Sequence, residues 1–162
     1  MDTFRIAVLV AATLATGLNA GLYYTYACSI MVTLRGVDDR TFVNMMQRIN
    51  RDITNGWFFL TFMGALLVPA LALILFIGVN GAVVLPVAIG LGLYVLSFGI
   101  TMGVNVPMNN RMDKVGDPDT MSPQALAEAR RVFEKPWVRS NLNRTLASTG
   151  SCGALCWALL SL

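Results

Sequence analysis

Four long stretches of the chain carry no charged side chain, and no other feature constrains the fold as strongly. They cover about residues 6–34, 57–77, 83–106 and 145–162. An apolar helix of roughly 17–25 residues can cross the hydrocarbon core of a bilayer, which is about 30 Å thick. The sequence therefore predicts an all-α integral membrane protein, a four-helix bundle that forms a single transmembrane domain over residues 1–162.

Charged residues are scarce and unevenly placed. They make up 13% of the chain, whose mean hydropathy is +0.62, whereas a soluble domain has about 25%. Because the charges gather between the apolar stretches, lipid is the expected solvent for most of the fold.

The first apolar stretch is longer than one membrane crossing requires. A helix over residues 6–34 would measure about 43 Å at 1.5 Å per residue, so we expect it to tilt or to protrude. It is also too long for the core of a signal peptide, and one Arg and one Asp precede it. We therefore interpret it as a retained helix.

Each of the two polar segments contains a predicted helix. Residues 36–55 form an amphipathic helix at the headgroup level, and Asp38 or Asp39 caps its start. In the second segment, residues 108–144, a short loop helix begins at Ser122 and ends at Pro136. The apolar face of the first helix contains Phe42, Met45, Met46, Ile49 and Ile53.

The distribution of basic residues predicts an orientation. Of the 12 Lys and Arg residues, all but Arg5 lie between the first and second or between the third and fourth apolar stretches. Cytoplasmic loops of membrane proteins carry the excess of positive charge. We therefore expect a multi-pass protein of the plasma membrane with both polar segments in the cytoplasm and both termini outside.

Several kinds of site are excluded by composition. The chain has no histidine, which is the commonest general base and transition-metal ligand. We expect no metal and no cofactor. A net charge of +3 without a nucleic-acid-binding motif predicts no nucleic-acid partner.

The three cysteines lie in apolar stretches and are interpreted as buried free thiols.

A few polar side chains interrupt the first apolar stretch. Asn19 lies near its middle, and Tyr23 and Tyr26 share its helical face, whereas Tyr24 does not. An amide in the membrane must face the protein interior to satisfy its hydrogen bonds. Asn19 is expected either to bond another helix or to contact a ligand, with Tyr23 beside it.

Asparagines also follow the third apolar stretch. Pro107 should break the helix after Val106. Asn105 and Asn109 are then expected either to satisfy the exposed carbonyl groups or to line the mouth of a pocket.

A second polar cluster precedes the last apolar stretch. Asn141 and Arg144 are three residues apart and so share a helical face, at the same depth as Asn105 and Asn109. Arg144 is either a snorkelling anchor or an inward-facing side chain that holds an anion. Trp137 is expected to be an interfacial anchor.

These motifs together resemble a four-helix membrane family of mostly uncharacterised bacterial proteins that is grouped with the fungal anthrone oxygenases. The resemblance implies a membrane bundle and, for the few characterised members, cofactor-independent oxidation of an anthrone to an anthraquinone. Relatives carry Trp-Asn-His before the arginine, where this chain has Ser140-Asn141-Leu142, so histidine-based proton abstraction is not available here. The matching segments are 16–26, 46–58, 101–110 and 137–145.

Three functions remain open. The first is binding of a small hydrophobic molecule, phenolic or polyketide-like, at the cytoplasmic end of the bundle, with lipids as the other contacts. The second is a cofactor-independent anthrone-type oxygenase. The third is a scaffold, either an oligomer or a partner subunit of a membrane complex. No catalytic residue is assigned, and the candidate pocket comprises Asn19, Tyr23, Asn105, Asn109, Asn141 and Arg144.

Overall fold

The computed structural model describes residues 2–162, and every regular element in this part of the chain is a helix. The prediction of an all-α protein is confirmed. The elements are α1 (Thr3–Thr25), the π-helical turn η1 (Tyr26–Ile30), α2 (Met31–Arg35), α3 (Asp39–Ile53), α4 (Gly56–Phe76), α5 (Gly81–Ile100), the π-helical turn η2 (Thr101–Asn105), α6 (Val106–Asp113) and α7 (Pro123–Leu160).

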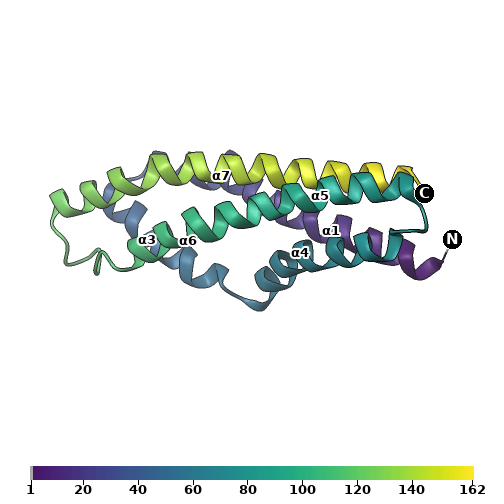
Figure 1. The fold of residues 1–162 in the computed structure, drawn as a ribbon. Coiled ribbons are helices and arrows are strands. Elements are labelled where there is room, and N and C mark those ends of the chain that lie inside the picture. The colour runs from purple at the N-terminus through teal and green to yellow at the C-terminus, as the bar shows by residue number, and fades with distance from the viewer. Residues whose placement is uncertain (1) are drawn as a thin grey trace.

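The long helices lie side by side (Figure 1). Helix α7 packs on α5 and α1, and α4 packs on the other sides of α1 and α5. Both termini lie at one end of the molecule, and α3 and α6 lie at the other. Near the termini, Leu9, Phe76, Val87 and Leu155 belong to one fully buried apolar cluster.

Three helical runs are long and apolar enough to cross a membrane, namely Thr3–Arg35, Gly56–Phe76 and Gly81–Asp113. They correspond to the first three predicted spans. The fourth predicted span lies in the second half of α7 and is not among these runs. Its apolar part within the helix is shorter and contains several serine and threonine side chains.

The predicted end of a helix at Pro136 is wrong. Helix α7 runs through this residue without interruption for 38 residues. Phe133 and Trp137 flank the proline, and both are buried with their rings stacked 5.9 Å apart. This packing outweighs the backbone hydrogen bond that proline removes. The cap at Ser122 is confirmed, since its side chain accepts a hydrogen bond from the Ala125 amide.

The predicted break after Val106 is wrong as well. The chain stays helical from α5 into α6 and widens into the π-helical turn η2 instead. Pro107 is the second residue of α6 and comes directly after this π-helical turn. A second π-helical turn, η1, interrupts the first long helix.

Helix α3 buries its apolar face against protein. Its start is capped by Asp38, which accepts from the Thr41 amide at 3.1 Å, as predicted. Phe42 and Met46 are fully buried in a cluster with residues of α6 and α7, whereas Met45 points outward. The helix therefore closes one end of the structure.

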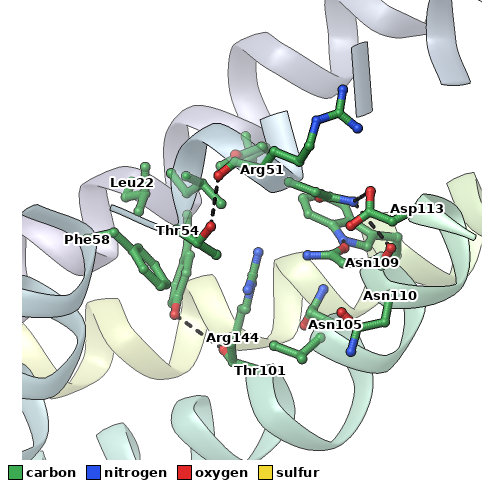
Figure 2. A pocket seen from close by; sticks show the side chains of 16 residues that line it. Leu22, Arg51, Thr54, Phe58, Thr101, Asn105, Asn109, Asn110, Asp113 and Arg144 are labelled. Carbon is green, nitrogen blue, oxygen red and sulfur yellow. Dashed lines mark hydrogen bonds between the residues drawn. The ribbon is translucent and has the colours of Figure 1, made fainter. Parts of the chain in front are cut away.

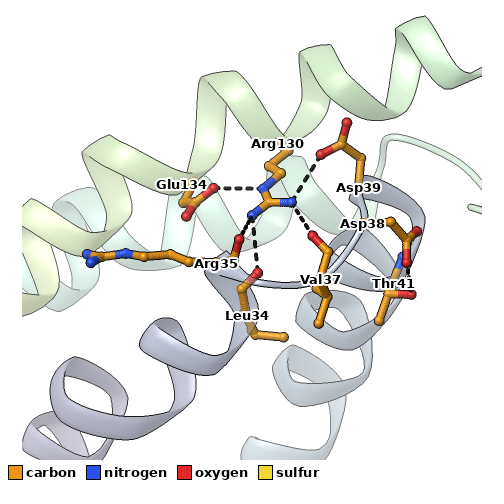
Figure 3. Close-up of polar contacts among 8 residues, drawn as sticks. All are labelled: Leu34, Arg35, Val37, Asp38, Asp39, Thr41, Arg130 and Glu134. Atoms are coloured by element: carbon orange, nitrogen blue, oxygen red, sulfur yellow. Dashed lines mark hydrogen bonds and ion pairs between the residues drawn. The ribbon is translucent and has the colours of Figure 1, made fainter.

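Arg130 of α7 links α7 to the start of α3 through ion pairs and hydrogen bonds (Figure 3). Arg130 pairs with Glu134 at 2.7 Å and with Asp39 at 3.1 Å. Burial acts to lower the pKa of Arg130, but the two carboxylates outweigh it and raise that pKa above its ordinary value. The guanidinium also donates to the backbone carbonyl groups of Leu34, Arg35 and Val37.

Candidate functional site

A cavity of about 330 Å³ lies where α3 and α6 meet the long helices (Figure 2). Its lining comes from α1, α3, α4, α7 and the continuous run from η2 to α6. Both π-helical turns contribute, through Tyr26 in η1 and through Thr101 and Asn105 in η2. A π-helical turn is often found beside a functional site.

Arg144 of α7 points into this cavity. The residue is only 6% exposed. Its guanidinium carbon lies 4.1 Å from the centre of the Tyr23 ring and 5.3 Å from that of Trp137. None of the ion pairs among residues 2–162 involves Arg144. The site thus holds a buried cation without a counter-ion, an arrangement that is costly unless something else compensates the charge.

Asn141 holds this arginine in place. Its Oδ1 accepts from Nε and Nη2 of Arg144 at 3.1 and 2.9 Å, and its Nδ2 donates to the Tyr23 carbonyl at 3.1 Å. Ser97 of α5 donates to the Arg144 carbonyl at 3.1 Å. The guanidinium is therefore oriented by Asn141 of its own helix and by the Tyr23 ring of α1, and Ser97 of α5 fixes the backbone at Arg144.

Two asparagines of the η2–α6 run contact α7. Asn105 accepts from the Ser140 hydroxyl at 2.8 Å, and Asn109 accepts from the Trp137 indole N–H at 2.8 Å. Asn105 is fully buried, and its Nδ2 has no acceptor. The cavity is therefore bordered by an amide N–H donor, Nδ2 of Asn105, that has no hydrogen-bond partner.

The inner wall of the cavity is aromatic and its mouth is polar. The wall includes Tyr23, Tyr26 and Trp137, and the Tyr23 hydroxyl lies 3.3 Å from that of Thr101. At the mouth, the Asn50 amide of α3 donates to the Asn109 carbonyl and to Asp113, both at 3.4 Å. Arg51, Thr54 and Asn110 complete the mouth.

The structure brings most of the candidate pocket residues together. Tyr23, Asn105, Asn109 and Arg144 line the cavity, and Asn141 lies directly behind Arg144. Asn19 does not line it. That side chain is fully buried, as expected, but neither its Oδ1 nor its Nδ2 makes a hydrogen bond.

Trp137 differs from its expected place. It is 2% exposed and packs inside the protein between Tyr26 and Phe133. Its ring therefore does not serve as an anchor facing lipid. The packing of α3 over this part of α7, which no local pattern indicates, is the reason.

Sequence reasoning missed three residues that line the cavity. Asn50 and Asp113 at the mouth and Thr101 on the inner wall were not candidates, although Asn50 and Thr101 lie in segments that carry the family resemblance. Asn50 and Asp113 come together because α3 packs on α6, and Thr101 reaches the cavity from η2.

The cysteines are free but less buried than expected. Cys28 and Cys156 are exposed and Cys152 is partly buried. Cys28 and Cys156 thus lie on the outer surface of the helices, whereas the Cys152 sulfur lies beside Gly17 of α1. Residues 2–162 contain no group of three or more His, Cys, Asp or Glu side chains arranged to hold a metal ion.

Comparison with known proteins shows which family the chain belongs to. No curated protein and no solved structure gives a significant match to the chain. The family model described as anthrone oxygenase matches residues 57–154, well over half of the chain. The matched region runs from the start of α4 into the second half of α7 and includes Asn105, Asn109, Asn141 and Arg144. The chain therefore belongs to the anthrone oxygenase family.

Proposed function

We propose that the protein is a membrane-embedded oxygenase. It holds a flat phenolic ketone of the anthrone class in the cavity and stabilises the enolate of that ketone while O2 oxidises it. The observation that carries this proposal is a pair of donor groups at the cavity: the guanidinium of Arg144, which has no carboxylate partner, and Nδ2 of Asn105, which has no acceptor. Hydrogen bonds with Asn141 and Ser140 orient these two groups, and both can donate to an oxygen of a bound molecule.

The proposed reaction balances with O2 as the only co-reactant. A proton leaves the ring methylene, and the electron pair of that C–H bond moves onto the carbonyl oxygen to form the enolate. O2 then forms a C–O bond at the former methylene carbon, and the resulting peroxide anion takes up a proton. The second hydrogen of that carbon then leaves as the O–O bond breaks, so that water is lost and a second carbonyl group forms. One ketone and one O2 thus give one quinone and one water.

The cavity suits the charge that develops in this reaction. Oriented donors in a site that excludes water stabilise an oxyanion strongly, and removal of one such donor typically costs about 10²–10³ in rate. Arg144 is positioned before the substrate arrives, because Asn141 already holds its Nε and Nη2. The aromatic wall suits a flat ring system, and about 330 Å³ falls within the range of small-molecule sites.

We place this site in a bundle of four membrane crossings, the fourth being the second half of α7. Two features support the arrangement. Both termini lie at one end of the molecule, as an even number of crossings requires. All but one of the 12 basic residues lie in the polar segments between the apolar stretches. These segments then face the cytoplasm, and an apolar substrate enters from the membrane.

The test is turnover by the purified protein in lipid nanodiscs. With 1,8-dihydroxyanthrone as substrate, we expect oxygen uptake and quinone formation in equal amounts, above the spontaneous oxidation measured in empty nanodiscs. With ¹⁸O2, one labelled oxygen should enter each quinone.

Two other results would assign a different function. Saturable binding of 1,8-dihydroxyanthraquinone without turnover would show that the cavity only binds such molecules. Neither binding nor turnover would refute the proposal and favour a scaffold or partner subunit.

A further inference from the structure

The cavity contains one carboxylate among the residues that the structure describes, that of Asp113. It lies at the mouth, at the end of α6, whereas Arg144 lies on the inner wall. The two opposite charges border the same space without forming an ion pair. The site therefore keeps a cation and a carboxylate apart, with room between them.

The structure also holds this carboxylate in position. Asn50 of α3 donates to Oδ1 of Asp113 at 3.4 Å. Gln47, one turn earlier and 6% exposed, donates to the carbonyl groups of Met112 at 3.1 Å and Gly116 at 3.0 Å. Helix α3 thus fixes both the side chain of Asp113 and the backbone around it.

We propose that Asp113 is the general base of the reaction, which rests on the oxygenase function proposed above. In an anthrone the carbonyl and the methylene lie on opposite sides of the central ring. With the carbonyl oxygen on Arg144, the methylene points away from the inner wall and toward the mouth. The C–H proton passes to the carboxylate of Asp113, and the electron pair moves to the oxygen at Arg144.

The proposed roles, Asp113 as the base and Arg144 as the group that stabilises the enolate, agree with known enzyme chemistry. An aspartate can abstract a proton next to a carbonyl group when separate donors stabilise the enolate. The chain has no histidine to perform this step. Because Asp113 is exposed at the mouth, it returns the proton to water after each turnover.

The rival base in the cavity is the phenol of Tyr23. Its ring lies 4.1 Å from the Arg144 guanidinium carbon, and its hydroxyl lies 3.3 Å from that of Thr101. The phenol is thus at the end of the cavity that receives the carbonyl oxygen. This position makes it a poor acceptor for a proton from the opposite side of the ring.

The test compares Asp113→Asn and Asp113→Ala with Asp52→Asn. Asp52 is an exposed carboxylate on α3, at the same end of the molecule, and is not part of the cavity lining. Loss of a general base lowers the rate by about 10²–10⁴, so we expect kcat to fall by that factor in both Asp113 variants. Binding of 1,8-dihydroxyanthraquinone should stay within about threefold, since donors remain. Asp52→Asn should keep full activity.

Chemical rescue separates catalysis from a structural role. Added acetate should restore part of the turnover of Asp113→Ala, because a small carboxylate can enter the vacated mouth, and should leave Asp113→Asn unchanged. A substrate deuterated at the methylene should react more slowly with the wild type.

Three results would overturn the inference. They are unchanged kcat in Asp113→Asn, a loss of kcat in Asp113→Ala that acetate does not restore, and turnover that Tyr23→Phe rather than Asp113→Asn abolishes. A wild type without any turnover would refute the oxygenase proposal itself, and an active wild type with an active Asp113→Asn refutes only the role of Asp113.

Discussion

Replacing Arg144 by lysine keeps the charge and removes the shape of the guanidinium. The native side chain donates to Asn141 through both Nε and Nη2, and its carbon lies 4.1 Å from the centre of the Tyr23 ring. An ammonium group cannot reproduce the planar fork or the stacking. A hydrogen bond to a charged group contributes about 1.5–3 kcal/mol and a desolvated cation–π contact about 0.5–2 kcal/mol. Because the residue is 6% exposed, solvent screens little of this.

The expected total loss is about 2–5 kcal/mol, which corresponds to roughly a 30- to 5,000-fold decrease in kcat/KM at about 1.36 kcal/mol per factor of ten. The assay is turnover of 1,8-dihydroxyanthrone in nanodiscs, with thermal unfolding as a second readout. The matched control is Arg139→Lys, since Arg139 is exposed on the same helix and does not line this cavity. Equal effects of the two substitutions on both readouts would refute the inward-facing role of Arg144.

Two further predictions concern topology and stability. The first uses single cysteines introduced at Thr41 and at Thr120 in a protein whose three native cysteines are changed to Ala. Both should react with a membrane-impermeant thiol reagent only after the cells are permeabilised. Labelling of both in intact cells would contradict the predicted orientation. Arg130→Met should lower the free energy of unfolding by about 2–3 kcal/mol, because hydrogen bonds to a charged group are lost. The control is Arg131→Met, which should have little effect because the Arg131 side chain is 73% exposed. Similar melting temperatures for the two variants would contradict the role of Arg130 in holding α3 against α7.

The long helices were predictable because the bilayer requires unbroken apolar stretches of a fixed length. Two helix boundaries were not. A proline next to a polar segment usually marks an end, but Phe133 and Trp137 on either side of Pro136 in the sequence stack on each other in the interior, and Pro107 follows a π-helical turn. At Pro136 the rings of Trp137 and Phe133 also pack on Tyr26 and Phe42, from distant parts of the chain, and such contacts leave no local signal.

Part of the candidate site could be predicted for a simple reason. Spacings of three and four residues place Asn141 with Arg144, and Asn105 with Asn109, on single helical faces. The same reasoning failed for Asp113 and Asn50, which meet through the fold of α3 over α6. For Asn19, which was expected to bond another helix or to contact a ligand, the structure shows a buried side chain without a hydrogen-bond partner that does not line the cavity.

The two π-helical turns determine which side chains of the following helices face the interior of the protein. Each closes hydrogen bonds to the fifth residue rather than the fourth and so accommodates one extra residue. One residue corresponds to about 100° of rotation around an α-helix. Removing a single residue from η2 would therefore turn all of α6 by about 100° and carry Asn109 away from the Trp137 indole that it now contacts. The cavity thus depends on the number of residues in these turns as well as on their identity.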